Sequence, residues 1–191
     1  MRRVLFVSGS LRRGSHNTAL LREAANALPN DVAHMWLDGI AALPPYCEDD
    51  DGGRGPAAVE RLRATIAAAD AVLIATPEYN GSMPGGLKNA VDWASRPFPD
   101  NAWRDKPVAV VGASTGIFGA VWAQAQLRTA LGLAGARVID VELAVAGSLH
   151  AFLPSGELRD PRLAGGLRGV VTALVGALSE HEPALARPAA A

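Results

Sequence analysis

Five strand-like segments alternate along the chain with five segments of helical periodicity, and this alternation is the feature that most constrains the fold. The strand-like segments are residues 4–7, 32–37, 71–75, 108–111 and 137–143. Three of them are unbroken apolar runs, typical of buried strands, whereas residues 32–37 alternate and are expected at a sheet edge. Each connection is long enough for a helix, and such crossovers are right-handed. We therefore predict an α/β fold with a doubly wound, five-stranded parallel sheet and helices on both faces.

Length and composition favour one globular domain. The chain has 191 residues, of which 49% are hydrophobic and 19% charged, and it shows no internal repeat or linker. We predict a single domain over residues 1–191, whose Pro- and Ala-rich end at about 182–191 is expected to fray. A net charge of −1 argues against nucleic acid or an acidic membrane surface as a partner.

Cysteine and histidine usage sets further bounds. Cys47 is the only cysteine, and the four histidines lack metal-ligand spacing, so we predict no disulfide and no metal site. No segment has the apolar core of a signal peptide or the length of a transmembrane helix. These features predict a cytoplasmic protein with no membrane partner.

A loop at residues 8–17, called the first loop, joins the first strand to the first helix and reads S-G-S-L-R-R-G-S-H-N. Hydroxyls, backbone amides and a guanidinium at a helix N-terminus are the groups that bind a phosphate. The alternative is that Ser15 or Asn17 only caps the helix, but one cap does not explain the whole cluster. The loop is neither a Walker A motif nor G-x-G-x-x-G, which disfavours a nucleotide triphosphatase and a Rossmann dehydrogenase.

Two further loops follow the third and fourth strands. The second loop, residues 77–82, reads P-E-Y-N-G-S and offers backbone donors and one aromatic side chain, which suits a flat ligand with a polar edge. The third loop, residues 112–119, reads G-A-S-T-G-I-F-G. In the flavodoxin-like strand order 2-1-3-4-5, the ligand crevice lies between strands one and three. The three loops therefore meet at one crevice, and they predict a mononucleotide with a large flat ring.

Segments 9–17, 77–82, 87–93 and 95–97 resemble the NAD(P)H-dependent FMN reductase family, which includes bacterial quinone, chromate and azo reductases. The resemblance covers roughly residues 3 to 178. It implies that the FMN phosphate is held by Ser10, Arg12, Ser15 and Asn17, and that the isoalloxazine lies along Pro77, Glu78, Tyr79 and Asn80. The third loop would add Ser114, Thr115 and Gly116. His16 and Gly81, which lie within the same motifs, complete the predicted cofactor-binding set.

The family resemblance implies an NAD(P)H-dependent FMN oxidoreductase that passes hydride through FMN to a quinone-like, azo, chromate or flavin acceptor. We predict no catalytic side chain, because Glu78 and His16 are the only carboxylate and histidine in these loops and form no nucleophile–base pair. One alternative is a non-enzymatic electron carrier like flavodoxin, which the near-neutral charge disfavours. Another is a flavin-binding protein without turnover. The sequence leaves the choice between NADH and NADPH open.

Family members usually form dimers or tetramers, and we expect the same here. Trp93, Phe98 and Trp103 are candidate contact residues, although core packing is an almost equally good explanation of them. The chain departs from the family pattern at Ala120 and Trp122, where a glycine and an arginine are frequent. This departure concerns the oligomer contacts and the access of the nicotinamide, and it leaves FMN binding as predicted.

Overall fold

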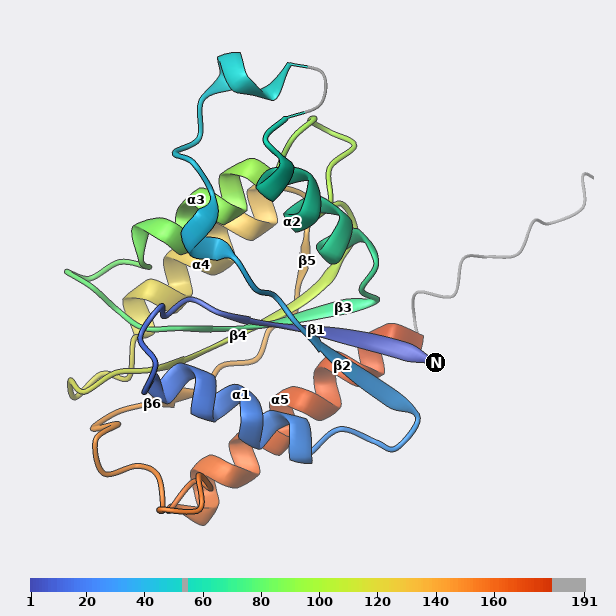
Figure 1. Ribbon diagram of the computed structural model, residues 1–191. Helices are drawn as coiled ribbons and strands as arrows, with labels where there is room; N and C mark the ends of the chain where they lie inside the picture. The colour runs from blue at the N-terminus through green and yellow to red at the C-terminus, as the bar shows by residue number, and fades with distance from the viewer. Residues whose placement is uncertain (53–54, 180–191) are drawn as a thin grey trace, which may run out of the picture.

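A parallel sheet with helices on both faces forms the centre of the protein (Figure 1). The computed structural model describes residues 1–52 and 55–179, so the predicted frayed end at residues 182–191 lies outside the described residues. The strands are β1 (Arg2–Ser8), β2 (Val32–Trp36), β3 (Ala71–Thr76), β4 (Pro107–Ala113), β5 (Arg137–Val138) and β6 (Ala144–Val145). The helices are α1 (His16–Asn26), α2 (Ala57–Ala67), α3 (Gly85–Ala94), α4 (Val121–Leu133) and α5 (Pro161–Ser179), with 3-10 turns η1 (Ile40–Ala42) and η2 (Glu48–Asp51).

The sheet has the order β2-β1-β3-β4-β5, and its strand pairs are parallel. This order confirms the predicted flavodoxin-like fold class. β3 and β4 are buried along their whole length, because they lie in the middle of the sheet between two helical layers. β2 lies at the edge, where its alternating pattern places it.

The predicted fifth strand at residues 137–143 is wrong in its extent. β5 pairs with the beginning of β4, where Arg137 lies opposite Pro107, and β6 pairs with its end, where Ala144 lies opposite Gly112. The offset between the numbers of paired residues is 30 at β5 (137 − 107) and 32 at β6 (144 − 112). The edge strand therefore contains two extra residues between these two pairings. Extra residues of this kind leave the ladder as a bulge.

The bulge between β5 and β6 is held from the neighbouring helix. Arg128 of α4 donates to the carbonyl oxygen of Val141 at 2.5 Å and to the carboxylate of Asp140 at 2.8 Å. The first bond satisfies a backbone carbonyl that has left the sheet, and the second pairs the guanidinium with an exposed carboxylate. β6 then rejoins β4 next to the third loop, with the Ser114 amide donating to the Val145 carbonyl.

Two hydrophobic cores lie on the two sides of the sheet, because successive side chains of a strand point to opposite faces. Val4 and Phe6 of β1 pack with α1 and α5, whereas Leu5 and Val7 pack with α2, α3 and α4. Figure 1 shows these two helical layers on either side of the strands.

The aromatic side chains proposed from the sequence as oligomer contacts lie mainly in the interior. Trp93 and Trp103 belong to the core under α2, α3 and α4 and are 0% and 2% exposed. The core-packing interpretation is therefore the correct one for both tryptophans. Phe98 is exposed and keeps its place among the surface candidates.

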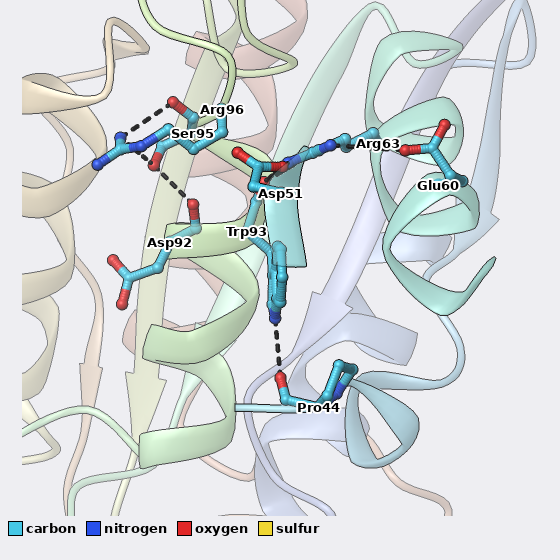
Figure 2. A network of polar contacts seen from close by, with 8 residues as sticks. All are labelled: Pro44, Asp51, Glu60, Arg63, Asp92, Trp93, Ser95 and Arg96. Atoms are coloured by element: carbon cyan, nitrogen blue, oxygen red, sulfur yellow. Dashed lines mark hydrogen bonds and ion pairs between the residues drawn. The ribbon is translucent and has the colours of Figure 1, made fainter. Parts of the chain in front are cut away.

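A polar network fastens the segment around η2 to the helices (Figure 2). The Arg63 guanidinium donates to the Trp93 carbonyl at 2.9 and 3.1 Å and to Asp51 at 2.5 Å, and it lies 3.5 Å from Glu60. The Trp93 indole N–H donates to the Pro44 carbonyl at 2.8 Å. The acidic run at residues 48–51 is therefore tied through Asp51 to α2 and α3, and we assign it a structural role.

Candidate functional site

The C-terminal ends of β1, β3 and β4 meet at one edge of the sheet, and the loops that follow them enclose a cleft of about 420 Å³, which includes open solvent at its mouth. The cleft is lined by Ser10, Arg12, Ser15, His16, Asn17, Pro77, Glu78, Tyr79, Ala113, Ser114, Thr115 and Ser148. The structure thus brings ten of the predicted site residues together. Asn80, Gly81 and Gly116 lie outside this lining, whereas Ala113 and Ser148 line the cleft and were not predicted.

The first loop presents the N-terminus of α1 to the cleft. Ser15 is the N-cap, and its hydroxyl accepts a hydrogen bond from the Thr18 amide at 3.2 Å. The helix dipole favours a negative charge at this position. Arg12 is exposed at the cleft and donates to the Gly14 carbonyl at 3.1 Å. Ser15 therefore does cap the helix, as the alternative interpretation had it. The Arg12 guanidinium and the other amides at the N-terminus of α1 can still bind an anion.

Gly9 lets the first loop lie close against α3. A Cβ atom at this position would lie 2.8 Å from the Leu87 side chain, which is closer than packed carbon atoms approach. The Gly9 amide also donates to the Ala75 carbonyl at 2.8 Å, so the first loop begins in contact with the end of β3. A larger residue at position 9 would require the buried Leu87 side chain to shift.

Asn17 joins the beginning of α1 to the end of β4. Its side chain is 3% exposed, donates to the Ala113 carbonyl at 2.9 Å and accepts from the Ala113 amide at 2.9 Å. The amide and the carbonyl of the buried residue Ala113 are therefore both satisfied by the Asn17 side chain. Asn17 lines the cleft, but its hydrogen bonds to Ala113 hold the protein backbone, which gives it a positioning role in addition to the predicted phosphate contact.

A fourth wall of the cleft comes from the segment at residues 146–152, called the fourth loop. The Ser148 hydroxyl is buried and lies 2.8 Å from Nδ1 of His16. The Ser148 amide donates to the Ser114 carbonyl at 3.0 Å, and the His16 ring stacks on Phe152 at 5.9 Å. Sequence reasoning missed this wall because the fourth loop carries no periodic pattern. The available sequence signal was the Gly147-Ser148 pair, and Gly147 has a positive φ of 55°, which glycine adopts readily.

Burial lowers the pKa of His16, and the positive charge of Arg12 lowers it further. The imidazole therefore favours its neutral form, in which one ring nitrogen donates and the other accepts. The neutral ring is suited to its hydrogen bond with Ser148.

The second loop is a tight turn fastened to α4. Tyr79 and Ser82 exchange backbone hydrogen bonds at 2.9 and 3.1 Å, and Asn80 and Gly81 between them have positive φ values of 52° and 74°. Positive φ at both central residues is the pattern of a type I′ turn, for which Asn-Gly is the preferred sequence. Asn80 and Gly81 therefore form the tip of the turn, which accounts for their place outside the cleft lining.

The groups around the cleft fit a mononucleotide that has one phosphate and a flat ring. The first loop supplies the helix N-terminus, the Arg12 cation and the Ser10 hydroxyl at one end. The second loop lines the other end with Pro77, Glu78 and the half-exposed Tyr79 ring. A parallel sheet in this order, with these loops at its switch point, defines a flavodoxin-like mononucleotide-binding protein.

Comparison with known proteins identifies the family within this class. Residues 2–150 match the family NADPH-dependent FMN reductase, and the chain belongs to this family. It is 45% identical over 161 residues to an NAD(P)H-dependent FMN reductase of Pseudomonas aeruginosa, and the alignment covers 84% of this chain and 86% of the relative. It is 38% identical over 173 residues to a quinone reductase of Escherichia coli, with coverages of 89% and 92%.

A solved structure shares the fold over nearly the whole chain. The flavoenzyme NAD(P)H:(acceptor) oxidoreductase FerB of Paracoccus denitrificans superposes with a TM-score of 0.82 at 37% identity, covering 95% of this chain and 99% of FerB. These relationships confirm the predicted family, the class of oxidoreductase enzyme and the dependence on FMN and NAD(P)H.

Within residues 1–52 and 55–179, no helix combines the length and apolarity that crossing a bilayer requires. In the same part of the chain, His, Cys, Asp and Glu side chains form no group of three or more that could hold a metal ion.

Proposed function

We propose that this protein is an NAD(P)H-dependent quinone reductase with FMN as its resident cofactor. The observation that carries the proposal is the gathering of three loops, separated along the sequence by about 60 and 30 residues, around one cleft at the switch point of the sheet. The quinone reductase and FMN reductase relatives support the choice of acceptor class. When bound, FMN supplies the redox chemistry, accepting hydride from the nicotinamide and delivering two electrons to the acceptor.

The side chains of the cleft would bind and orient the cofactor. Ser10, Arg12 and Ser15, together with the N-terminus of α1, would hold the phosphate. Pro77, Glu78 and Tyr79, which line the cleft, would lie along the polar edge of the ring, and Asn80 and Gly81 would form the turn that carries them. Ser114, Thr115 and Gly116 of the third loop would complete the wall, and His16, Asn17 and Ser148 would hold the walls together.

We assign no proton-transfer step to a side chain. The carboxylate of Glu78 accepts hydrogen bonds from the N-terminus of α4, and His16 is bonded to Ser148. Both groups are therefore engaged with the protein. The contribution of the chain is to bind, to orient and to exclude water, while solvent supplies the proton that the product needs.

An exposed apolar rim at the beginning of α4 supports assembly into a homodimer or homotetramer. Phe118 and Trp122 pack edge to face with ring centroids 4.8 Å apart, and Ile117 next to them is 80% exposed. Exposed apolar clusters of this kind mark interaction surfaces. Trp122 is also, with Ala120, one of the two positions at which the chain departs from the family pattern, so this rim would distinguish its assembly or nicotinamide access from that of its relatives.

The proposed location is the cytoplasm, and the proposed partners are a small electron acceptor and further copies of the chain, with no nucleic acid or membrane. The exposed single thiol of Cys47 and the near-neutral net charge of −1 support this assignment.

The test is turnover by purified protein that has been reconstituted with FMN. We expect steady oxidation of NADH or NADPH, each supplied separately, that depends on 1,4-benzoquinone. The flavin released on denaturation should be FMN, because the cleft offers one phosphate site. A flavin-loaded protein that does not oxidise either nicotinamide would support the electron-carrier alternative. Release of FAD, or failure to bind flavin, would overturn the cofactor assignment.

A further inference from the structure

The carboxylate of Glu78 occupies the N-terminus of α4. Its Oε2 atom accepts hydrogen bonds from the backbone amides of Trp122 and Ala123, at 3.1 and 3.2 Å. The N-cap position of α4, Ala120, has no side-chain hydrogen bond to the helix and a left-handed φ of 66°. Glu78 therefore supplies from 44 residues away the acceptor that a capping side chain gives locally, and its negative charge lies at the positive end of the helix dipole.

A second cross-link lies one turn further along the same helix. The Gln126 side chain donates to the Gly81 carbonyl at 3.1 Å and accepts from the Ser82 hydroxyl at 2.6 Å. The two cross-links hold the second loop at its beginning and at its end. The loop and the first turns of α4 are therefore joined by four hydrogen bonds and form one body.

We propose that Glu78 is a positioning residue that holds the second loop in its flavin-binding shape by capping α4. This inference rests on the proposed function, since it assumes that the backbone amides of the second loop contact the flavin ring. Glu78 lines the cleft, yet its carboxylate charge is offset by helix amides. The loop can therefore offer its own amides to the ring without an uncompensated anion beside them.

Variants at both ends of the contact test the proposal. Glu78→Ala removes the acceptor, and Glu78→Gln keeps a neutral acceptor of the same length. Trp122→Pro removes one of the two donors, and Trp122→Ala is its matched control because it also loses the indole ring but keeps the amide. Proline is tolerated here because an amide in the first turn has no partner within the helix.

The primary readout is the dissociation constant of FMN and of riboflavin. Glu78→Ala should weaken both flavins by about 10-fold, the loss expected for a hydrogen bond to a charged group. The equal loss is expected because the second loop contacts the ring that both flavins share. Glu78→Gln should lose less than Glu78→Ala, and Trp122→Pro should bind flavin more weakly than Trp122→Ala.

Two further measurements separate positioning from other roles. In the flavin-free protein, hydrogen exchange at the amides of residues 122 and 123 should accelerate in Glu78→Ala, which reports the contact without any flavin. The midpoint potential of bound FMN should be lower in Trp122→Pro than in Trp122→Ala, since the carboxylate keeps its charge and loses a donor. A tenfold selective loss for reduced flavin corresponds to about 30 mV.

The outcomes distinguish this inference from the proposed function. Wild-type protein that binds no flavin would overturn both. Wild-type protein that binds FMN while Glu78→Ala binds both flavins equally well would overturn only the positioning role. Complete loss of turnover in flavin-saturated Glu78→Gln would assign Glu78 a proton-transfer role in place of the positioning role. If Glu78→Ala does not fold, the two Trp122 variants carry the same comparison.

Discussion

Replacing Asn17 by alanine should destabilise the protein by an amount that follows from its two buried hydrogen bonds. The substitution leaves the amide and the carbonyl of Ala113, a residue 2% exposed, without the side chain that satisfies both. An unsatisfied buried backbone group costs about 1–3 kcal/mol. Water that enters the space left by the side chain would recover part of this cost, so the two groups together should cost roughly 2–4 kcal/mol.

The assay is equilibrium urea unfolding of the flavin-free protein, with Asn26→Ala as the matched control. Asn26 lies at the exposed end of the same helix, so the same substitution there should change the stability by less than about 0.5 kcal/mol. For a chain of this size, a loss of 2–4 kcal/mol corresponds to a melting temperature lower by roughly 4–16 °C. Equal stabilities of the two variants would refute the argument that Asn17 holds the end of β4.

Four further predictions concern the cofactor, the kinetics, the pH dependence and the assembly. Arg12→Ala should weaken FMN roughly 10- to 100-fold and leave riboflavin unchanged, since riboflavin lacks the phosphate; equal losses by titration would exclude phosphate recognition by Arg12. Initial rates over a grid of NAD(P)H and quinone concentrations should give parallel double-reciprocal lines, because one exposed slot serves both substrates in turn, and intersecting lines would rule out that shared slot. The pKa of His16 is lowered in the folded protein, so its contribution to stability is present above pH 6.5 and is lost as the pH falls through the pKa of the folded state. Urea unfolding between pH 7.5 and 5.5 should therefore show a smaller loss of stability in His16→Gln than in wild type. The same dependence of the unfolding free energy on pH in both proteins would contradict this assignment. Light scattering at micromolar concentration should return two or four times the chain mass of 19.8 kDa, whereas the mass of a single chain would refute the proposed assembly.

The sequence predicted the sheet order and most of the cleft because both follow from local pattern and topology. The apolar runs at residues 71–75 and 108–111 lie within fully buried strands, and burial on both faces is what an unbroken run requires. Once the strands are parallel, their C-terminal ends share one edge. The loops that follow β1, β3 and β4 therefore meet whatever their own sequences are.

The features that escaped prediction depend on contacts between distant parts of the chain. The two-residue bulge before β6 is held by Arg128 from α4, and no local pattern marks such a contact. Ser148 reaches His16 across 132 residues, and Glu78 reaches α4 across 44. Trp93 illustrates a different limit, because a large aromatic side chain suits a core and an interface equally well, and only the packing of α2 and α3 decides between them.

The contact between Glu78 and α4 has a consequence for how this enzyme can diversify. The carboxylate bonds to backbone amides, so the contact is indifferent to which side chain occupies position 122, with proline as the exception. Natural variation or a mutant library at Phe118 and Trp122 could therefore change the exposed apolar rim while the second loop keeps its contact with α4. The exposed rim and the flavin-binding loop can thus vary independently in this scaffold, although both are carried by the beginning of α4.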